Sequence, residues 1–499
     1  MKRVVIVGNG LAGHRLAERL ARHGSKLTVT VLGAEPHAAY NRVLLSSVLA
    51  EGGDPARVML AEPSVTIRLG ARVVGIDACA RTVTLADSAP DSEAGDLETA
   101  ADAEVVGYDQ LILATGSRPL LPPIPGLGLP DGTTAPGVVT FRTVEDTRRI
   151  AALAAQGPMA VVGGGLLGVE AARGLAGLGV EVTLVHPLPH LMERQLDSGA
   201  ADVLARLLTG HGVQLRLDVA AVSWTPGALL LSDDTTLPVA GVVVTTGVAP
   251  QTWLARSAGL LVRRGIVVDD QLATSVPDIY AIGECAEHRG VCHGLVEPCW
   301  EQADVVADVV SGASPSARYN GSSIVTRLKA RGIDLASMGE LSAVADSGEP
   351  CEVIALSDAS RGRYGTVRLR EGRIVGAVLV GLPEATGPVI QLFDSRATVP
   401  GDRFGLLLGR AAGPTADSPA LLPARALICR CNGVSKGELM TAWQSGARTV
   451  KSLTDRTRVT TGCGTCASAV EGICSWLADA DPSVEQPSVS PAAGREGVA

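Results

Sequence analysis

The sequence predicts an α/β protein of several domains, in which small residues let helices pack closely against parallel sheets. Its 499 residues are too many for a single hydrophobic core, so two to four domains are expected. Hydrophobic residues make up 46% of the chain but aromatic residues only 3%, and there are 58 glycines. In addition, the order strand, glycine-rich turn, helix and strand occurs twice, which is typical of nucleotide-binding α/β domains.

The first of these patterns lies near the start of the chain. Residues 4–13 read VVIVGNGLAG, an apolar strand followed by Gly8, Gly10 and Gly13, and an amphipathic helix comes next. The three glycines permit a tight turn, close approach of a pyrophosphate, and packing of the helix on the strand. The next strand, LTVTVLGAE, ends at Glu35, where a carboxylate can accept a hydrogen bond from a ribose hydroxyl. This combination predicts a dinucleotide site.

The second pattern reads MAVVGGGLLGVEAARGLAGLGVEVTLVHP and contains Gly163, Gly165 and Gly168. Two such patterns imply two dinucleotides, one for each domain. The second strand of this pattern ends at His186 followed by proline, and no acid is placed there for the 2′-hydroxyl of NADH. No arginine is placed there for the 2′-phosphate of NADPH either, although Arg194 lies further on. A protonated histidine is able to pair with that phosphate, so a pH-dependent preference is one expectation.

Two more segments carry a resemblance to a known family. LILATGSRP at Leu111–Pro119 and TSVPDIYAIGECAE at Thr274–Glu287 resemble signatures of the FAD/NAD(P)-dependent pyridine nucleotide-disulfide oxidoreductases. The resemblance implies FAD on the first turn and NAD(P)H on the second. That family has Gly-Asp in the second segment, and its carboxylate holds the ribitol chain of the flavin; here this role would pass to Glu284. The resemblance implies cofactor contacts at Thr115, Gly116, Gly247, Gly283 and Glu284.

The same resemblance implies a domain organisation. The FAD-binding domain is interrupted by the NAD(P)H-binding domain, and both are Rossmann-like. A strand-rich α+β interface domain follows, in which YGTVRLREGRIVGAVLVG alternates as two strands around a turn at Glu371 and Gly372. The expected segments are 1–119 with 246–325 for FAD, 120–245 for NAD(P)H, 326–408 for the interface, 409–426 for a linker, 427–478 for a small helical domain, and 479–499 for a disordered tail.

The segment AYNRVLLSS resembles the corresponding motif of ferredoxin-reductase flavoproteins. Those proteins often carry a lysine after Leu-Ser, and it pairs near the flavin with a glutamate of the second glycine motif. Glu170 matches this glutamate, but Ser47 stands in the place of the lysine, which leaves Glu170 without that partner. Arg42 of the same segment is expected to contact FAD.

The cysteines outside the C-terminal region give no sign of thiol chemistry. Residues 1–78 contain none, which disfavours reduction of disulfides or peroxides by a thiol beside the flavin. Accordingly, no catalytic side chain is expected. We expect Cys285, Cys292 and Cys299 to pack as small residues near the cofactor, and Cys79, Cys351 and Cys474 to fill the core.

Four cysteines near the C-terminus form the pattern C-x-C, a gap of 31 residues, and C-x-x-C: Cys429, Cys431, Cys463 and Cys466. Zinc, disulfides and an iron–sulfur cluster are the three alternatives. Ser435 with Glu438 predicts a helix start, and Thr449 predicts a second one. CRCNGV and GCGTC resemble the bacterioferritin-associated ferredoxins, which implies a 2Fe–2S cluster held by the four cysteines.

Charge and hydropathy along the chain exclude some classes of partner and indicate a cellular compartment. The net charge is −9 and there is no basic run, which argues against nucleic acid. No apolar stretch approaches the length needed to span a bilayer. The chain opens with MKRVVIVGNG, a strand and turn rather than a signal peptide, so the cytoplasm is expected.

The whole combination resembles the electron-transfer subunit of assimilatory nitrate reductases, and equally the N-terminal part of NADH-dependent nitrite reductase large subunits. The cysteine pairs of the sirohaem domain are absent, so the expectation is that electrons pass to another protein. The resemblance implies a route from NAD(P)H, with NADH favoured, through FAD and the cluster to a molybdenum nitrate reductase subunit. The alternatives are a separate nitrite reductase, a ferredoxin or rubredoxin reductase, and a redox-sensing module.

Overall fold

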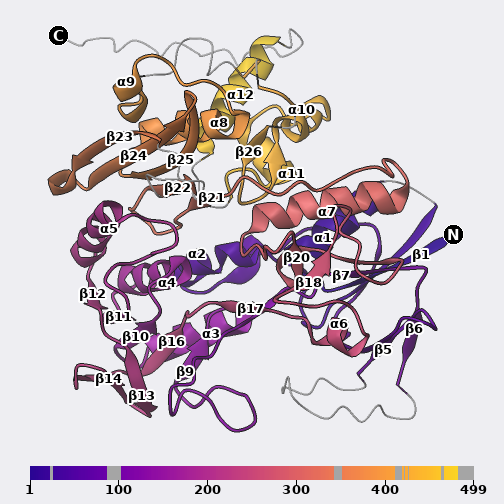
Figure 1. Ribbon diagram of the computed structural model, residues 1–499, viewed down its shortest axis with the longest axis horizontal. Coiled ribbons are helices and arrows are strands. Elements are labelled where there is room, and N and C mark those ends of the chain that lie inside the picture. Colours follow the sequence, from indigo (N-terminus) through magenta and orange to yellow (C-terminus); the bar gives the residue numbers. More distant parts are fainter. Residues whose placement is uncertain are drawn as a thin grey trace, which may run out of the picture. The chain divides into compact units, whose positions relative to one another are not determined.

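A computed structural model describes residues 1–22, 26–86, 103–341, 351–410, 419–420, 422–424, 426–461 and 466–480. The chain forms two compact units, Met1–Gly413 and Pro414–Ala499 (Figure 1). The boundary between them falls inside the predicted linker 409–426. The predicted α/β class is confirmed, because two of the three five-stranded sheets of the first unit are parallel and carry helices.

The first parallel sheet is built around β1, whose residues from Val4 onward are buried. A central parallel strand is covered on both faces, which explains its run of apolar residues without alternation. The helices α1 (Leu11–Ala21) and α7 (Val296–Ser311) lie side by side on this sheet (Figure 1). In spatial order the strands are β19 (Ile279–Ala281), β7 (Gln110–Leu113), β1 (Lys2–Val7), β2 (Leu27–Leu32) and β3 (Thr66–Arg68).

The second parallel sheet repeats this arrangement around β10. Its helix α3 begins at a capping box in which Thr143 and Asp146 exchange hydrogen bonds, which satisfies backbone donors at the helix start. The strands in spatial order are β12 (Val213–Leu217), β11 (Val182–His186), β10 (Met159–Val162), β16 (Gly241–Val244) and β9 (Val138–Thr140). The helices are α3 (Val144–Ala154), α4 (Leu166–Gly177) and α5 (Ser198–Gly210).

Shorter elements complete the two sheet regions. Each region carries an antiparallel sheet of three strands: β4 (Val73–Asp77), β5 (Thr82–Leu85) and β6 (Val105–Gly107), and β13 (Ala221–Thr225), β14 (Ala228–Leu231) and β15 (Thr236–Pro238). The strands β8 (Ser117–Pro119) and β17 (Val248–Pro250) pair antiparallel where the chain leaves the first region and returns. The remaining elements are α2 (Leu45–Ala50), α6 (Trp253–Ser257), β18 (Ile266–Val268), β20 (Ala286–His288), η1 (Arg42–Leu44), η2 (Pro55–Val58) and η3 (Gly283–Cys285).

An antiparallel sheet follows the two parallel ones. The predicted turn is present between β24 and β25, and Glu371 and Gly372 have φ angles of 52° and 70°. Two successive positive φ values match the twist of a tight hairpin. The strands in order are β21 (Val325–Arg327), β22 (Leu335–Gly339), β25 (Arg373–Val380), β24 (Arg363–Arg370) and β23 (Glu352–Asp358), with η4 (Ala359–Arg361), α8 (Pro383–Ser395) and α9 (Arg403–Leu407) beside them.

The second unit is a small helical domain with its own core. Both predicted helix starts are confirmed: Ser435 with Glu438, and Thr449 with Ser452, form capping boxes. The core packs Leu439, Leu453 and other apolar residues together with cysteines. The elements are β26 (Leu427–Cys429), β27 (Val434–Ser435), α10 (Lys436–Gln444), α11 (Val450–Thr457) and α12 (Ala467–Ala480).

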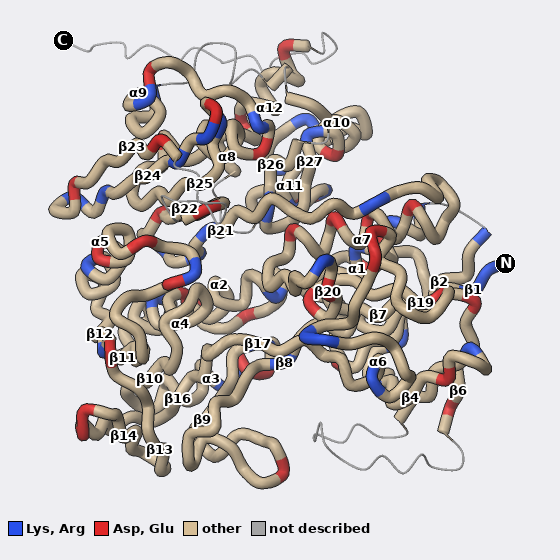
Figure 2. The backbone as a smooth tube through the Cα atoms, viewed as in Figure 1, with Lys and Arg blue, Asp and Glu red and all other residues tan. Residues whose placement is uncertain are grey.

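Charged residues of both signs are interspersed along the backbone of each unit (Figure 2). The whole chain has 43 lysines and arginines against 52 acidic residues. No helix within the described residues combines the length and the apolar composition needed to cross a membrane.

Candidate functional site

The first glycine turn connects β1 to α1 and leaves no room for side chains at two positions. Gly8 has a φ of 113°, and a methyl group there would lie 2.2 Å from the carbonyl oxygen of Ala114, directly after the neighbouring strand β7. A methyl group on Gly13 would lie 2.0 Å from the carbonyl oxygen of Gly8. At Gly10, by contrast, the nearest atom is Nη2 of Arg42 at 3.8 Å, so this face of the turn is open. The backbone N–H groups at the start of α1 can therefore approach an anion.

Asn9 gives an independent sign that this turn is built for a ligand. Within the described part of the chain, neither the oxygen nor the nitrogen of its side-chain amide has a hydrogen-bond partner, although both atoms are shielded from solvent. Buried amides are normally paired, because an unpaired one costs about 1–3 kcal/mol. A dinucleotide at this turn would supply acceptors and donors of the required kind.

Glu35, Tyr40 and Arg42 form a hydrogen-bonded group beside the turn. The hydroxyl of Tyr40 donates to one Glu35 oxygen at 2.6 Å, and Nη2 of Arg42 donates to the other at 2.9 Å. Burial raises the pKa of Glu35, but Arg42 and Tyr40 outweigh it and the pKa is lowered. The carboxylate is therefore ionised and oriented. The structure brings Glu35 and Arg42 together next to Gly10, and their contacts with FAD stay predictions.

The predicted positions Thr115 and Gly116 lie directly before β8, and Gly247 lies directly before β17, which pairs antiparallel with β8. Thr115 donates through its hydroxyl to the Gln251 carbonyl at 2.9 Å, and Gln251 N–H donates to the carbonyl of Gly116 at 2.9 Å. Gly116 and Gly247 have φ angles of 71° and 104°, which favour glycine. These hydrogen bonds connect the segment at Thr115 and Gly116, where the chain leaves the first sheet region, to Gln251, where the chain returns to it.

Glu284, predicted to hold the ribitol chain, already has partners. Its carboxylate accepts a hydrogen bond from Ser117 Oγ at 2.6 Å and one from Nη2 of Arg142. Burial raises the pKa of Glu284, but Arg142 and Ser117 outweigh it and lower the pKa overall. The neighbouring Gly283 N–H donates to Gln302 of α7 at 2.7 Å. Sequence reasoning missed Arg142, because nothing in its local sequence marks it and 142 residues separate it from Glu284.

The second glycine turn connects β10 to α4. A methyl group on Gly168 would lie 1.8 Å from the carbonyl oxygen of Gly163, and Gly163 itself has a φ of 115°. A methyl group on Gly165 would meet no atom within 4 Å, so this turn is also open where a pyrophosphate would approach. His186 ends β11 and accepts a hydrogen bond from Gly164 N–H at 3.0 Å. The donor set and the space fit a dinucleotide.

In the second unit, two of the predicted ligand cysteines lie next to one another. The sulfurs of Cys429 and Cys431 lie 3.6 Å apart, and Nδ2 of Asn432 lies 3.7 Å from Cys429 Sγ. Cys466 precedes α12 and is buried. Within the described ranges no three histidine, cysteine or acidic side chains converge on one metal position, and Cys463 lies outside those ranges. The four-cysteine ligand set therefore stays a prediction.

The chemistry of these thiols fits a cationic centre. A hydrogen bond with Cys431 lowers the pKa of Cys429, but the neighbouring thiol of Cys466 and burial raise it, to about 11. Thiolates this close disfavour one another unless a cation lies among them. Iron–sulfur clusters bind cysteine as thiolate, so an iron centre would satisfy groups that otherwise stay protonated.

Comparison with protein families agrees with this geometry. The model of the pyridine nucleotide-disulphide oxidoreductases matches residues 2–305, which is more than half of the chain. The chain belongs to this family. The rubredoxin NAD+ reductase C-terminal domain matches residues 325–385 of the oxidoreductase, and the BFD-like 2Fe-2S binding domain matches residues 427–475. The cofactors of these domains are FAD, NAD(P)H and a 2Fe–2S cluster.

Two curated relatives of the oxidoreductase are named as a nitrite reductase and as a nitrate reductase subunit. It is 36% identical over 95% of its length to a nitrite reductase [NAD(P)H] of Bacillus subtilis, and 32% identical over 96% to the assimilatory nitrate reductase electron transfer subunit of the same organism. It spans 57% and 60% of those two proteins.

Solved structures of two reductases resemble the oxidoreductase. A ferredoxin reductase from Rhodopseudomonas palustris has a TM-score of 0.70 at 25% identity, and covers 83% of this chain and 100% of its own. A putidaredoxin reductase, solved in covalent complex with putidaredoxin, has a TM-score of 0.69 at 25% identity, and covers 81% of this chain and 97% of its own.

Glu170 of the oxidoreductase has a lysine partner that the sequence motif does not reveal. Its carboxylate lies 3.4 Å from Nζ of Lys329, and it also accepts hydrogen bonds from Lys329 N–H at 2.9 Å and Ser46 Oγ at 2.6 Å. Ser47, the residue at the family's lysine position, is not that partner. The helices α2 and α4 lie side by side here (Figure 1), and a methyl group on Gly174 would lie 3.3 Å from Cβ of Ala50.

Of the remaining thiols within the described residues, only two lie in a core. Cys285 and Cys299 are buried in the first core, and burial raises the pKa of Cys285, which keeps the thiol protonated. Cys351 and Cys474 are half-buried. The expectation for Cys79 is wrong, because it is exposed: it lies in the turn between β4 and β5, where its N–H donates to Asp77.

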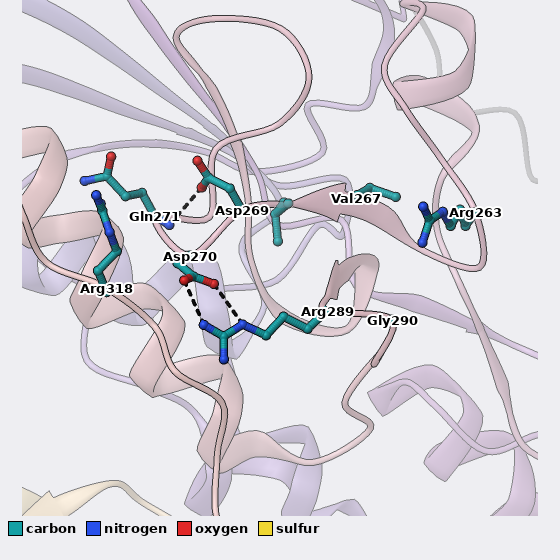
Figure 3. A pocket seen from close by; sticks show the side chains of 9 residues that line it. Arg263, Val267, Asp269, Asp270, Gln271, Arg289, Gly290 and Arg318 are labelled. Carbon is teal, nitrogen blue, oxygen red and sulfur yellow. Dashed lines mark hydrogen bonds and ion pairs between the residues drawn. The ribbon is translucent and has the colours of Figure 1, made fainter.

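One surface cavity of about 540 Å³ lies away from both glycine turns, beside β18 (Figure 3). The Asp270 carboxylate is already hydrogen-bonded to His288 and to Arg289, whose Nη2 lies 2.7 Å from Oδ2 of Asp270. Arg263 and Arg318 lie at opposite ends of the cavity and do not point toward one another (Figure 3). The cavity therefore lacks the convergent groups of an anion site.

Proposed function

We propose that the oxidoreductase passes electrons from NAD(P)H to a partner reductase, and that this partner is the molybdenum-containing catalytic subunit of an assimilatory nitrate reductase. When bound, FAD would supply hydride acceptance from NAD(P)H and release of single electrons, and the 2Fe–2S cluster would supply one-electron transfer. The chain's own residues would position these groups: two glycine turns for the dinucleotides and the C-terminal cysteines for the cluster.

The observation that carries this proposal is the pairing of two dinucleotide turns with a thiol-rich domain in one chain, without a cysteine in residues 1–78. A flavin that has no neighbouring redox thiol needs another electron acceptor. The thiols of Cys429, Cys431 and Cys466 are suited to hold one. The similarity to a nitrate reductase electron transfer subunit over 96% of this chain supports the choice of partner.

A second candidate partner is a nitrite reductase, favoured by the 36% identity to a nitrite reductase [NAD(P)H]. The two candidates differ in the terminal acceptor alone, so the same preparation tests both. The purified chain, loaded with FAD and iron, is mixed with each partner enzyme and NADH, and consumption of nitrate or nitrite is followed.

The role of the cluster is tested with Cys431→Ser, which removes one predicted ligand and leaves the first unit unchanged. Reduction of ferricyanide by NADH should persist, because small acceptors take electrons directly from flavin. Nitrate reduction with the partner should fall at least about tenfold, since the loss of a thiolate ligand removes the acceptor. Cys474→Ser, which alters a half-buried thiol outside the predicted ligand set, is the matched control. Near-normal nitrate reduction by Cys431→Ser would contradict the proposal.

A further inference from the structure

The end of β11 lacks the acid that usually selects between the two nicotinamide dinucleotides, and its histidine is held in place. Nδ1 of His186 accepts the hydrogen bond from Gly164 N–H at 3.0 Å, and the side chain is 8% exposed. A nitrogen that accepts carries no proton, so the ring is neutral with its proton on Nε2. Burial also lowers the pKa of His186, which disfavours the cation. His186 therefore cannot supply positive charge to a 2′-phosphate.

A carboxylate from the following loop lies next to the histidine. Oε2 of Glu193 is 3.4 Å from Nε2 of His186. The Glu193 side chain is 34% exposed, so its carboxylate lies at the boundary between the buried ring and the solvent.

The loop is anchored to the glycine turn by the two residues directly before Glu193. Met192, directly before Glu193, is fully buried and donates its N–H to the carbonyl of Gly164 at 2.9 Å. Gly164 thus uses its N–H for His186 and its carbonyl for Met192. The side chain of Leu191 packs here as well, because a methyl group on Gly164 would lie 2.7 Å from its Cδ2. The backbone at Glu193 is therefore held beside the turn, although Glu193 lies seven positions after the end of the strand.

We infer that Glu193 determines the dinucleotide specificity of the second turn, accepting a hydrogen bond from the adenosine 2′-hydroxyl of NADH and repelling the 2′-phosphate of NADPH. The ribose of a dinucleotide on such a turn lies at the end of the second strand, where an acid binds the 2′-hydroxyl. Here the acid reaches that position from the loop. Like charges brought together at a binding site cost affinity, and this creates specificity against the wrong ligand. The inference rests on the proposed function, in which NAD(P)H is the electron donor.

The experiment measures the rate of flavin reduction by NADH and by NADPH in the FAD-loaded full chain, together with the dissociation constants of NAD+ and NADP+. The wild type should prefer NADH. Glu193→Gln keeps the shape and removes the charge, so the NADPH/NADH ratio of kcat/KM should rise about tenfold. Glu193→Arg should raise the ratio further and tighten NADP+ binding, because arginine pairs with phosphate.

Arg194→Gln is the control, because this neighbouring exposed cation is the rival determinant. The inference predicts that Arg194→Gln leaves the ratio within about twofold of the wild type. The inference is overturned if Glu193→Gln and Glu193→Arg leave the ratio unchanged, or if the wild type prefers NADPH and loses that preference in Arg194→Gln. If neither dinucleotide reduces the flavin of the wild type, the proposed function itself fails.

Discussion

The two glycine turns share one sequence pattern but differ in what surrounds them. At the first turn, β2 ends at Leu32 rather than at Glu35 as predicted, and Glu35 follows it as an ionised carboxylate held by Tyr40 and Arg42. At the second turn, the equivalent strand ends in His186, which is neutral and bound to the turn backbone. The glycines thus set the backbone geometry of each turn, whereas residues outside the motif set the charge beside it.

The largest effect is expected from filling the closed positions of each turn. Gly13→Ala and Gly168→Ala place a methyl group 2.0 Å and 1.8 Å from a backbone oxygen, and each should destabilise its sheet region by about 3 kcal/mol. Gly13→Ala should lose FAD, which is measured by flavin absorbance after gel filtration. Gly168→Ala should lower flavin reduction by NADH, which is measured by stopped flow.

Gly165→Ala separates closed positions from open ones. Its methyl group meets no atom within 4 Å, so the thermal unfolding temperature should stay near that of the wild type. NADH binding should nevertheless weaken, because the backbone can no longer approach the pyrophosphate as closely. Equal unfolding temperatures for Gly168→Ala and Gly165→Ala would contradict this distinction.

An intermediate effect is expected from breaking the ion pair between Lys329 and Glu170, a residue of the helix α4 that follows the second glycine turn. Glu170 is 4% exposed, and it joins α4 to α2 through Ser46 and to the antiparallel sheet region through Lys329. Lys329→Met leaves the buried carboxylate without its cation and should reduce the free energy of unfolding by about 3 kcal/mol. Denaturant unfolding followed by circular dichroism measures this change.

Two controls accompany Lys329→Met. Lys451 pairs with Asp455 on the surface of α11, where both side chains are more than half exposed, so Lys451→Met should change stability by less than about 0.5 kcal/mol. Combining Lys329→Met with Glu170→Gln should recover part of the loss, because no buried charge then remains unpaired. A Lys329→Met variant as stable as Lys451→Met would show that the pair contributes nothing.

The smallest effect concerns pH. Burial lowers the pKa of His186, so the unfolded chain binds this proton more tightly than the folded chain. The contribution of His186 to stability is therefore retained above the unfolded pKa of about 6.5 and lost as the pH falls below it. The pKa of Glu35 is also lowered, and its contribution is lost at lower pH, below about 4.3.

Two measurements follow from this difference. His186→Gln should lose less thermal stability than the wild type between pH 7 and pH 5.5. The NADPH/NADH ratio of the wild type should stay constant from pH 8 to pH 6.5, contrary to the pH-dependent preference that a protonated histidine would produce. A ratio that rises toward NADPH as the pH falls would place the histidine cation at the 2′-phosphate.

Local patterns were predictable from the sequence because they depend on neighbours in the chain. The two glycine turns, the capping boxes at Ser435 and Thr449 and the hairpin turn at Glu371 all follow from backbone conformations that only certain residues adopt. Family resemblance added the FAD, NAD(P)H and cluster domains, which the family comparisons confirm. The contacts of individual residues with these cofactors stay predictions.

Only the tertiary structure decided which charges meet. Lys329 reaches Glu170 across 159 residues of sequence, and Arg142 reaches Glu284 across 142. Glu193 reaches the end of β11 because Met192 binds the glycine turn. No local pattern encodes such pairs, since burial of an ion is tolerated only where the complete fold delivers its partner. The sequence by itself predicted the two glycine turns as dinucleotide sites, and the packing of distant segments decided which charges surround those turns.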